Sequence, residues 1–124
     1  MSNLVKDITT FETKIYKISG PLGKNMVVKS GQKKIEIGQI LSFDETTGKL
    51  VKYEKRGEEG TPPGNEAFTI ALSEADATSN DVTVLVAVPN TVFNSKEIKG
   101  ATLTDDFKVV KDLWGNGIIL EEVE

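Results

Sequence analysis

Two runs of alternating apolar and polar residues give the clearest structural signal in the chain. In residues 67–72 every second side chain is large and apolar, and in residues 81–88 four valines alternate with Thr83, Leu85 and Ala87. An alternation with a period of two predicts β-strands. Leu85 and Ala87 make the second face of the later strand apolar as well. We therefore expect either a closed barrel or burial of this face against another subunit.

Shorter strands are predicted on both sides of these two runs. Gly38 interrupts an apolar stretch at a point where a bulge or corner is expected. A hairpin turn is predicted from Asp44 to Gly48, because Asp44 can bond the turn backbone and Gly48 can adopt a positive φ. Polar residues predict turns in 73–81 and an exposed loop in 54–66. The further predicted strands are residues 26–28, 31–43 with the break at Gly38, 50–53, 91–94 and 118–120.

One convincing helix is predicted near the end of the chain. Thr104 is the expected N-cap, two aspartates follow in the first turn, and Gly115 provides the stop. A single helical turn is also expected at residues 95–98. Trp114 is interpreted as a core anchor or an interface anchor, with the core favoured. The apolar residues that are expected to pack on the sheet recur at helical spacing: Leu103, Phe107, Val110 and Trp114.

The composition restricts the chemistry that the chain can perform. Its 124 residues are typical of one domain with a modest core, and it contains no cysteine and no histidine. This excludes disulfides, zinc sites built on those residues, histidine bases and cysteine nucleophiles. Asp44 and Glu45 lack the alternating oxygen ligands of a calcium loop. We find no catalytic motif, so we expect a protein that is not an enzyme and has no cofactor or metal.

The sequence also carries no signal for a membrane. No apolar run approaches the roughly 18 residues that span a bilayer. Residues 1–10 contain no apolar stretch suited to a signal peptide. We therefore expect the protein to stay in the cytoplasm unless an assembly carries it out.

Charge is distributed unevenly along the chain. Seven lysines and two acidic residues precede residue 35, a balance of +5, whereas eight basic and seventeen acidic residues follow, a balance of −9. The chain is therefore a basic N-terminal segment on an acidic body. An acidic body does not favour nucleic acid as a partner, because phosphates require a basic face.

The N-terminal segment has only weak periodicity up to Gly31. It can be read as the first strands of the domain or as an extended arm that becomes ordered on a partner. The arm is favoured up to about Phe11, and a strand is favoured for residues 26–28. We predict an arm in residues 1–25 and a single β-rich domain in residues 26–124.

Several segments of the body resemble the lambda-type head decoration proteins of tailed bacteriophages. They are residues 37–41 (IGQIL), 44–53 (DETTGKLVKY), 67–84 (AFTIALSEADATSNDVTV) and 92–94 (VFN). The resemblance covers roughly the last three quarters of the chain. It implies a mainly β fold, a small barrel-like domain of the β-clip kind, with one C-terminal α-helix. It also implies a virion protein whose homotrimers bind the major capsid protein on the outer surface of an expanded head and stabilise it.

The resemblance assigns two sets of candidate site residues. In these proteins the N-terminal segment contributes to capsid contact, so the lysines of the arm are expected to face acidic capsid surface. The expected capsid-binding residues of the arm are Lys6, Phe11, Lys14, Ile15, Tyr16, Lys17 and Lys24. The residues expected at the trimer interface are Val82, Leu85, Ala87 and Trp114.

Two other classes of function remain as alternatives. A small β-barrel that binds carbohydrate or peptide would need an exposed aromatic platform, for which Trp114, Tyr16 and Tyr53 are the candidates. A nucleotide hydrolase would need a buried carboxylate beside a glycine-rich phosphate loop. The segment 57–60 (GEEG) is not followed by Lys-Ser or Lys-Thr, and its carboxylates would repel phosphate.

Overall fold

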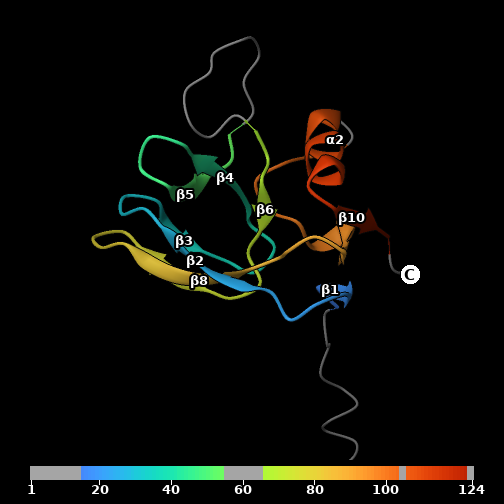
Figure 1. The fold of residues 1–124 in the computed structure, drawn as a ribbon, viewed down its shortest axis with the longest axis horizontal. Helices are drawn as coiled ribbons and strands as arrows, with labels where there is room; N and C mark the ends of the chain where they lie inside the picture. Colours follow the sequence, from blue (N-terminus) through green and yellow to red (C-terminus); the bar gives the residue numbers. More distant parts are fainter. Residues whose placement is uncertain (1–14, 55–65, 104–105, 123–124) are drawn as a thin grey trace, which may run out of the picture.

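The computed structural model describes residues 15–54, 66–103 and 106–122 (Figure 1). It confirms the predicted class, a mostly β domain with one helix near the C-terminal end. A 3-10 turn, Ser95–Glu97, and helix α2, Phe107–Gly115, accompany the strands. The strands are β1 (Lys17–Ser19), β2 (Lys24–Val28), β3 (Lys33–Ile35), β4 (Ile40–Asp44), β5 (Lys49–Lys52), β6 (Thr69–Ile70), β7 (Ala75–Ala77), β8 (Val82–Val86), β9 (Thr91–Asn94) and β10 (Ile118–Glu121).

The largest sheet has five strands in the order β6-β4-β5-β2-β8 and curls toward a half-barrel. Within this sheet, β2 and β5 pair in parallel, and the other described pairs are antiparallel. The two ends of the sheet meet, because Ala71 bridges Val86 and the Leu72 amide donates to the Leu85 carbonyl over 2.7 Å. The curl gives the second face of β8 partial cover within the subunit, in agreement with the barrel-like prediction.

A second sheet holds β1, β9 and β10, in the order β1-β9-β10. Strands β9 and β10 run parallel, and helix α2 lies on the connection between them (Figure 1). A parallel pair needs such a crossover, which explains why the helix occurs at this point of the chain. Strands β3 and β7 form a separate two-stranded ribbon.

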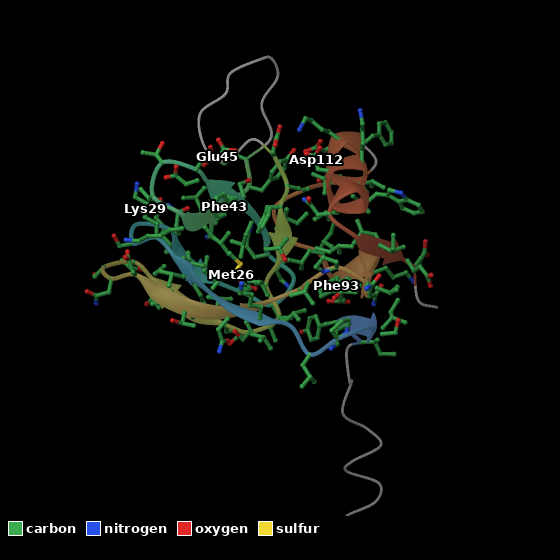
Figure 2. The ribbon with its side chains drawn as sticks, viewed as in Figure 1. Met26, Lys29, Phe43, Glu45, Phe93 and Asp112 are labelled. Atoms are coloured by element: carbon green, nitrogen blue, oxygen red, sulfur yellow. The ribbon has the colours of Figure 1, made fainter. Side chains whose placement is uncertain are left out.

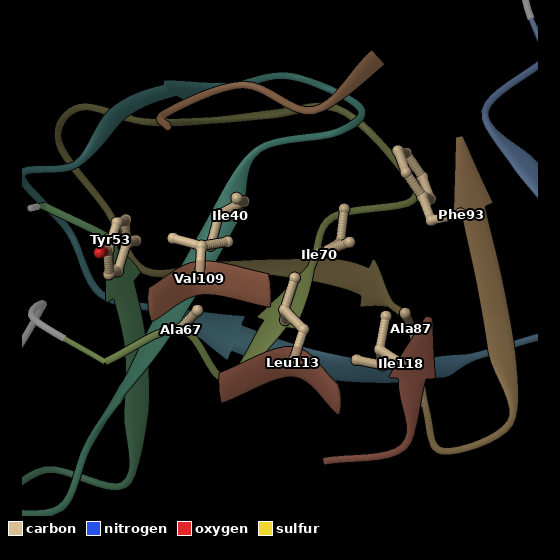
Figure 3. Close-up of a cluster of buried hydrophobic side chains, with 9 residues drawn as sticks. All are labelled: Ile40, Tyr53, Ala67, Ile70, Ala87, Phe93, Val109, Leu113 and Ile118. Atoms are coloured by element: carbon tan, nitrogen blue, oxygen red, sulfur yellow. The ribbon is translucent and has the colours of Figure 1, made fainter. Parts of the chain in front are cut away.

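Two clusters of buried apolar side chains form the core. The first lies beneath α2 and joins it to both larger sheets (Figure 3); its members are Ile40, Tyr53, Ala67, Ile70, Ala87, Phe93, Val109, Leu113 and Ile118. The second lies within the curled sheet, where Met26 packs against it (Figure 2); its members are Val28, Ile35, Leu41, Leu50, Ala71, Ala77, Val84 and Val86. The predicted strands of residues 67–72 and 81–88 thus contribute to both clusters.

The predicted hairpin and corner are both confirmed. The Asp44 carboxylate accepts hydrogen bonds from the Thr46 amide at 2.9 Å and the Thr47 hydroxyl at 3.0 Å, and Gly48 has a φ of 74°. The bond from the Thr46 amide is the main reason that the pKa of Asp44 is lowered. Gly38 has a φ of 97°, and a Cβ there would collide with the Glu97 carbonyl. The chain can therefore turn into β4 only at a glycine.

The polar segment 73–81 was predicted to form turns, and this is wrong for its centre. Residues Ala75–Ala77 form β7, which pairs antiparallel with β3. Main-chain pairing with β3 outweighs the turn preference of Asp76. The carboxylate of Asp76 instead accepts a 3.0 Å hydrogen bond from the Thr78 amide just beyond the strand.

The face of the helix that packs on the sheet was also predicted incorrectly. Val109 and Leu113 are fully buried, whereas 70% of Phe107 and 66% of Trp114 is exposed. Trp114 is therefore not a core residue of the subunit. Leu103 does pack against the first cluster, as expected. The expected cap Thr104 and residue 105 lie outside the described residues.

Part of the segment expected to form the arm, residues 1–25, pairs with strands of the domain. Strand β1 pairs with β9, and the first residues of β2, Lys24 and Asn25, pair with Val86 and Leu85. Both segments therefore belong to the sheets. Lys6, Phe11 and Lys14, like the loop 57–64, lie outside the described residues. Within the described ranges, no helix is long and apolar enough to cross a membrane.

Candidate functional site

The expected site residues that the structure describes fall in three regions. Ile15, Tyr16 and Lys17 lie where the described chain enters the second sheet, whereas Trp114 lies on α2. Lys24 lies on β2 and is hydrogen-bonded through its strand to β8, the strand of Val82 and Leu85. The two expected sets are thus connected through the β2–β8 pair.

The entry of the chain is held by the side chain and backbone of Asn94. Its Nδ2 donates a 2.7 Å hydrogen bond to the Ile15 carbonyl, and its backbone amide donates one of the same length to the Tyr16 carbonyl. The Asn94 Oδ1 also caps the following 3-10 turn by accepting from the Lys96 amide. Asn94 therefore positions both the entry of the chain and the 3-10 turn.

The side chains at this entry are partly accessible. Ile15 is 48% exposed, and Tyr16 packs against the first core cluster with the Lys99 ammonium 5.8 Å from its ring centroid. The Lys17 ammonium donates a 2.6 Å hydrogen bond to the Pro21 carbonyl. Strand β1 is an edge of its sheet in the described chain, so it offers backbone groups to an added strand.

Lys24 lines a pocket of about 240 Å³ between β2, β8 and the end of α2. Most of the other lining side chains are apolar, and Met26 and Phe68 are among them. Phe68 also packs on Phe43, with the ring centroids 5.3 Å apart. The pocket therefore combines the positive charge of Lys24 with a mostly apolar lining, an arrangement that indicates no particular reaction.

The residues expected at a subunit interface differ in what they can offer. Val82 and Leu85 are half-buried, and Trp114 is mostly exposed. Ala87 is only 4% exposed and belongs to the core beneath α2, so it has almost no surface to present. The structure does not bring Trp114 into any described contact with Val82 or Leu85.

Helix α2 presents an apolar face that the sequence reading had assigned to the core. Phe107, Val110 and Trp114 follow each other at helical spacing and are 70%, 38% and 66% exposed. Three large apolar side chains on one exposed face of a nine-residue helix are a feature of interaction surfaces. Val109 and Leu113 lie four residues apart on the opposite face of the helix, and this spacing was the sequence signal for the face that is buried.

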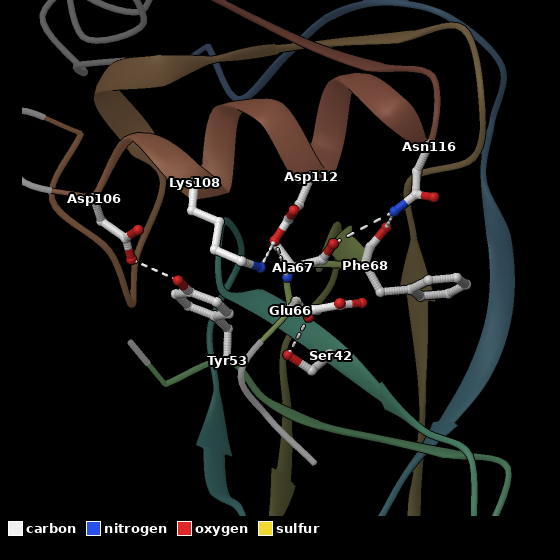
Figure 4. Close-up of polar contacts among 9 residues, drawn as sticks. All are labelled: Ser42, Tyr53, Glu66, Ala67, Phe68, Asp106, Lys108, Asp112 and Asn116. Atoms are coloured by element: carbon white, nitrogen blue, oxygen red, sulfur yellow. Dashed lines mark hydrogen bonds and ion pairs between the residues drawn. The ribbon is translucent and has the colours of Figure 1, made fainter. Parts of the chain in front are cut away.

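Polar contacts fix the helix on the sheets (Figure 4). The Asp112 Oδ2 accepts hydrogen bonds from the Ala67 amide at 3.1 Å and from the Lys108 ammonium at 2.7 Å. The Tyr53 hydroxyl donates to Asp106 over 2.6 Å. Burial is the main cause of the raised pKa of Tyr53, and the bond to Asp106 adds to it. These contacts hold the exposed face of α2 in one orientation.

The aromatic platform of the binding-module alternative does not form. Tyr53 is 4% exposed, and its hydroxyl is used by Asp106, so it cannot lie beside Trp114 on one open surface. In the described part of the chain, no three His, Cys, Asp or Glu side chains group to hold a metal ion.

The described residues thus form a small β-rich domain with an exposed apolar helix face and an edge strand, two features that suit contacts with other proteins. The family model of the bacteriophage lambda head decoration protein D matches residues 15–112. The chain therefore belongs to this family, a family of structural head proteins, which gives it a capsid decoration role and a place in the virion. No curated protein matches the chain.

Proposed function

We propose that the chain forms a homotrimer that binds the outer surface of an expanded phage head and stabilises the shell. It is made in the host cytoplasm, joins the head as a structural component, and catalyses no reaction. The family match over residues 15–112 carries this proposal. The partner on the shell is the major capsid protein.

The exposed apolar surface supports a self-associated state. Phe107 and Trp114 on α2, with the half-buried Leu85 on β8, are side chains that gain free energy when a second subunit removes them from water. A ring of three subunits uses one patch against a different patch, so these residues need not face their own copies. Aromatic side chains are enriched in such contacts.

The entry of the chain supports the shell contact. Strand β1 is a sheet edge, Ile15 is half-exposed, and Lys17 and Lys24 add positive charge to an otherwise acidic body. Main-chain pairing at the edge and the lysines of the arm would act together on an acidic shell surface. Lys6 and Lys14 extend the same charge pattern toward the N-terminus.

The test measures assembly first and shell binding second. Light scattering gives the mass of the free protein across a concentration series, and purified expanded heads are then mixed with it and heated. We expect a trimer mass and heads that release their contents at a higher temperature when decorated. Heads that bind no protein at saturating concentration would contradict the decoration role, whereas monomers that bind singly would contradict only the trimer.

A further inference from the structure

The joint between α2 and β10 contains the dipeptide Asn116–Gly117, the one Asn-Gly pair in the sequence. Asn116 is the C-cap of the helix, with its backbone amide donating to the Leu113 carbonyl at 2.9 Å. Its side-chain Nδ2 points back to the segment before β6 and donates to the Ala67 and Phe68 carbonyls at 3.4 and 3.3 Å (Figure 4). The amide of Asn116 thus ties the end of the helix to that segment.

Neither residue of the pair is easily replaced. Gly117 has a φ of 82°, and a Cβ at this position would stand 2.9 Å from the Cβ of Pro89. A side chain is therefore excluded by both backbone conformation and space. The bonds to two carbonyl oxygens require a donor at Asn116, which a carboxylate cannot supply. The fold thus retains a dipeptide that is chemically labile.

We propose that Asn116 is a latent deamidation site that the fold suppresses, and that its conversion to a carboxylate releases the end of α2 from the segment before β6. In the reaction, the Gly117 backbone nitrogen loses its proton to hydroxide or a buffer base and attacks Cγ of Asn116. Ammonia leaves and a cyclic succinimide forms. One water then opens the ring to aspartate or isoaspartate, so no oxidant or reductant is needed.

The native contacts oppose the attack in two ways. The Gly117 N–H donates a 2.9 Å hydrogen bond to the Trp114 carbonyl, which holds the attacking nitrogen within the helix terminus. The Asn116 amide is held toward Ala67 and Phe68, which restricts the rotation that would bring Cγ to that nitrogen. Deamidation therefore requires local opening of the helix end, and its rate is lowered by the fraction of molecules that are open.

The product would not fit the site of the amide. A carboxylate at residue 116 would face two carbonyl oxygens without a proton to share, which replaces attraction by repulsion. The isoaspartate form would also lengthen the backbone at the helix terminus by one carbon. Both products would loosen α2 beside Trp114. This inference does not depend on the proposed function.

The test follows deamidation of the full-length protein by peptide mass spectrometry at mildly alkaline pH, with and without denaturing urea at the same temperature. The readout is the mass gain of an amide-to-acid conversion at residue 116, and Asn90, which precedes Thr91, is the internal control. We expect conversion at residue 116 in urea and suppression of at least about tenfold in the folded protein. Equal rates in both states would overturn the protection.

Three variants test the consequence for the helix. Asn116→Asp supplies the product directly, Asn116→Ala removes the donor without adding charge, and Asn116→Gln keeps an amide that cyclises slowly. We expect Asn116→Asp to have the lowest urea midpoint at neutral pH and to approach Asn116→Ala in acid, where the new carboxyl is protonated. An Asn116→Asp protein as stable as wild type at neutral pH would overturn the proposed release.

Discussion

The phenolic hydroxyl of Tyr53 donates a 2.6 Å hydrogen bond to Oδ2 of Asp106, the residue that precedes helix α2. Both side chains belong to buried residues, 4% and 5% exposed. A buried carboxylate is costly unless a donor satisfies it, and here the donor comes from the chain that follows β5. The bond therefore joins the start of the helix to the curled sheet.

Replacing Tyr53 by Phe should weaken the domain without changing its packing. The ring is retained, but the Asp106 carboxylate loses a buried partner, which should lower the free energy of unfolding by about 1–3 kcal/mol. Urea unfolding followed by fluorescence of Trp114 measures the change. Tyr16→Phe is the matched control, and it should have a much smaller effect. Equal effects of the two variants would show that the bond to Asp106 has no special weight.

The same pair predicts a loss of stability in alkali. The pKa of Tyr53 is raised in the folded protein, first by burial and then by Asp106. Its contribution to stability is fully present below the ordinary tyrosine pKa of about 10 and is lost as the pH rises toward the folded value. The difference in unfolding free energy between wild type and Tyr53→Phe should therefore shrink above about pH 10. A difference in unfolding free energy that stays constant above about pH 10 would contradict the raised pKa of Tyr53.

The strands were predictable because their signal is local. The alternation in residues 81–88 predicted a strand, and its residues Val84 and Val86 are indeed in the core. The turn at Asp44 and Gly48 was equally readable, because its hydrogen bonds lie within a few residues. The local sequence pattern therefore predicted most strands of the curled sheet.

The remainder depended on partners distant in sequence. Strand β7 forms by pairing with β3, and the sequence of Ala75–Ala77 contains no pattern that predicts this pairing. On α2, two apolar series overlap, and only the sheet beneath decides that Val109 and Leu113 are buried and Trp114 is not. Asp106, one of the two aspartates expected in the first turn of the helix, was misplaced for the same reason. The helix begins at Phe107, and Asp106 precedes it and accepts a hydrogen bond from Tyr53, 53 positions away in the sequence.

Substitutions at two neighbouring positions on α2 distinguish effects on folding from effects on assembly. Leu113→Ala should lower the free energy of unfolding by about 2–5 kcal/mol, because Leu113 is fully buried. Trp114→Ala should cost the isolated subunit less than about 1 kcal/mol, since two thirds of the side chain is exposed. It should nevertheless lower the mass seen by light scattering. A Trp114→Ala protein with the same mass as wild type at every concentration would remove Trp114 from the interface.

Two truncations define where the shell-binding segment ends. Removing residues 1–14 should leave the thermal stability nearly unchanged, because the matched family domain begins at residue 15. It should abolish or strongly reduce head binding, because it deletes Lys6 and Lys14 of the proposed arm. Removing residues 1–19 should also destabilise the domain. It deletes β1 and leaves Asn94 without the carbonyls of Ile15 and Tyr16. If the protein that lacks residues 1–14 bound heads as well as wild type, these residues would be excluded from the contact with the shell.

Binding to heads should weaken as salt is added. The lysines of the N-terminal segment would meet shell carboxylates in a partly solvated contact that is screened over about 8 Å at physiological ionic strength. Each exposed pair contributes only about 0.2–1 kcal/mol, so one Lys→Ala change should be barely visible. A variant with four changes should bind visibly less at low salt and show a shallower salt dependence; the changes are at Lys6, Lys14, Lys17 and Lys24.

The comparison of slopes is what isolates the electrostatic part of the contact. Apolar and main-chain contacts at β1 respond little to ionic strength, so wild type should keep some occupancy on heads in high salt. Lys29, Lys33, Lys34 and Lys49, four lysines away from the chain entry, make a charge-matched control variant. That control should retain the wild-type slope. If the arm variant and wild type instead gave parallel curves, the four lysines would be ordinary surface charge, and shell binding would rest on the uncharged contacts alone.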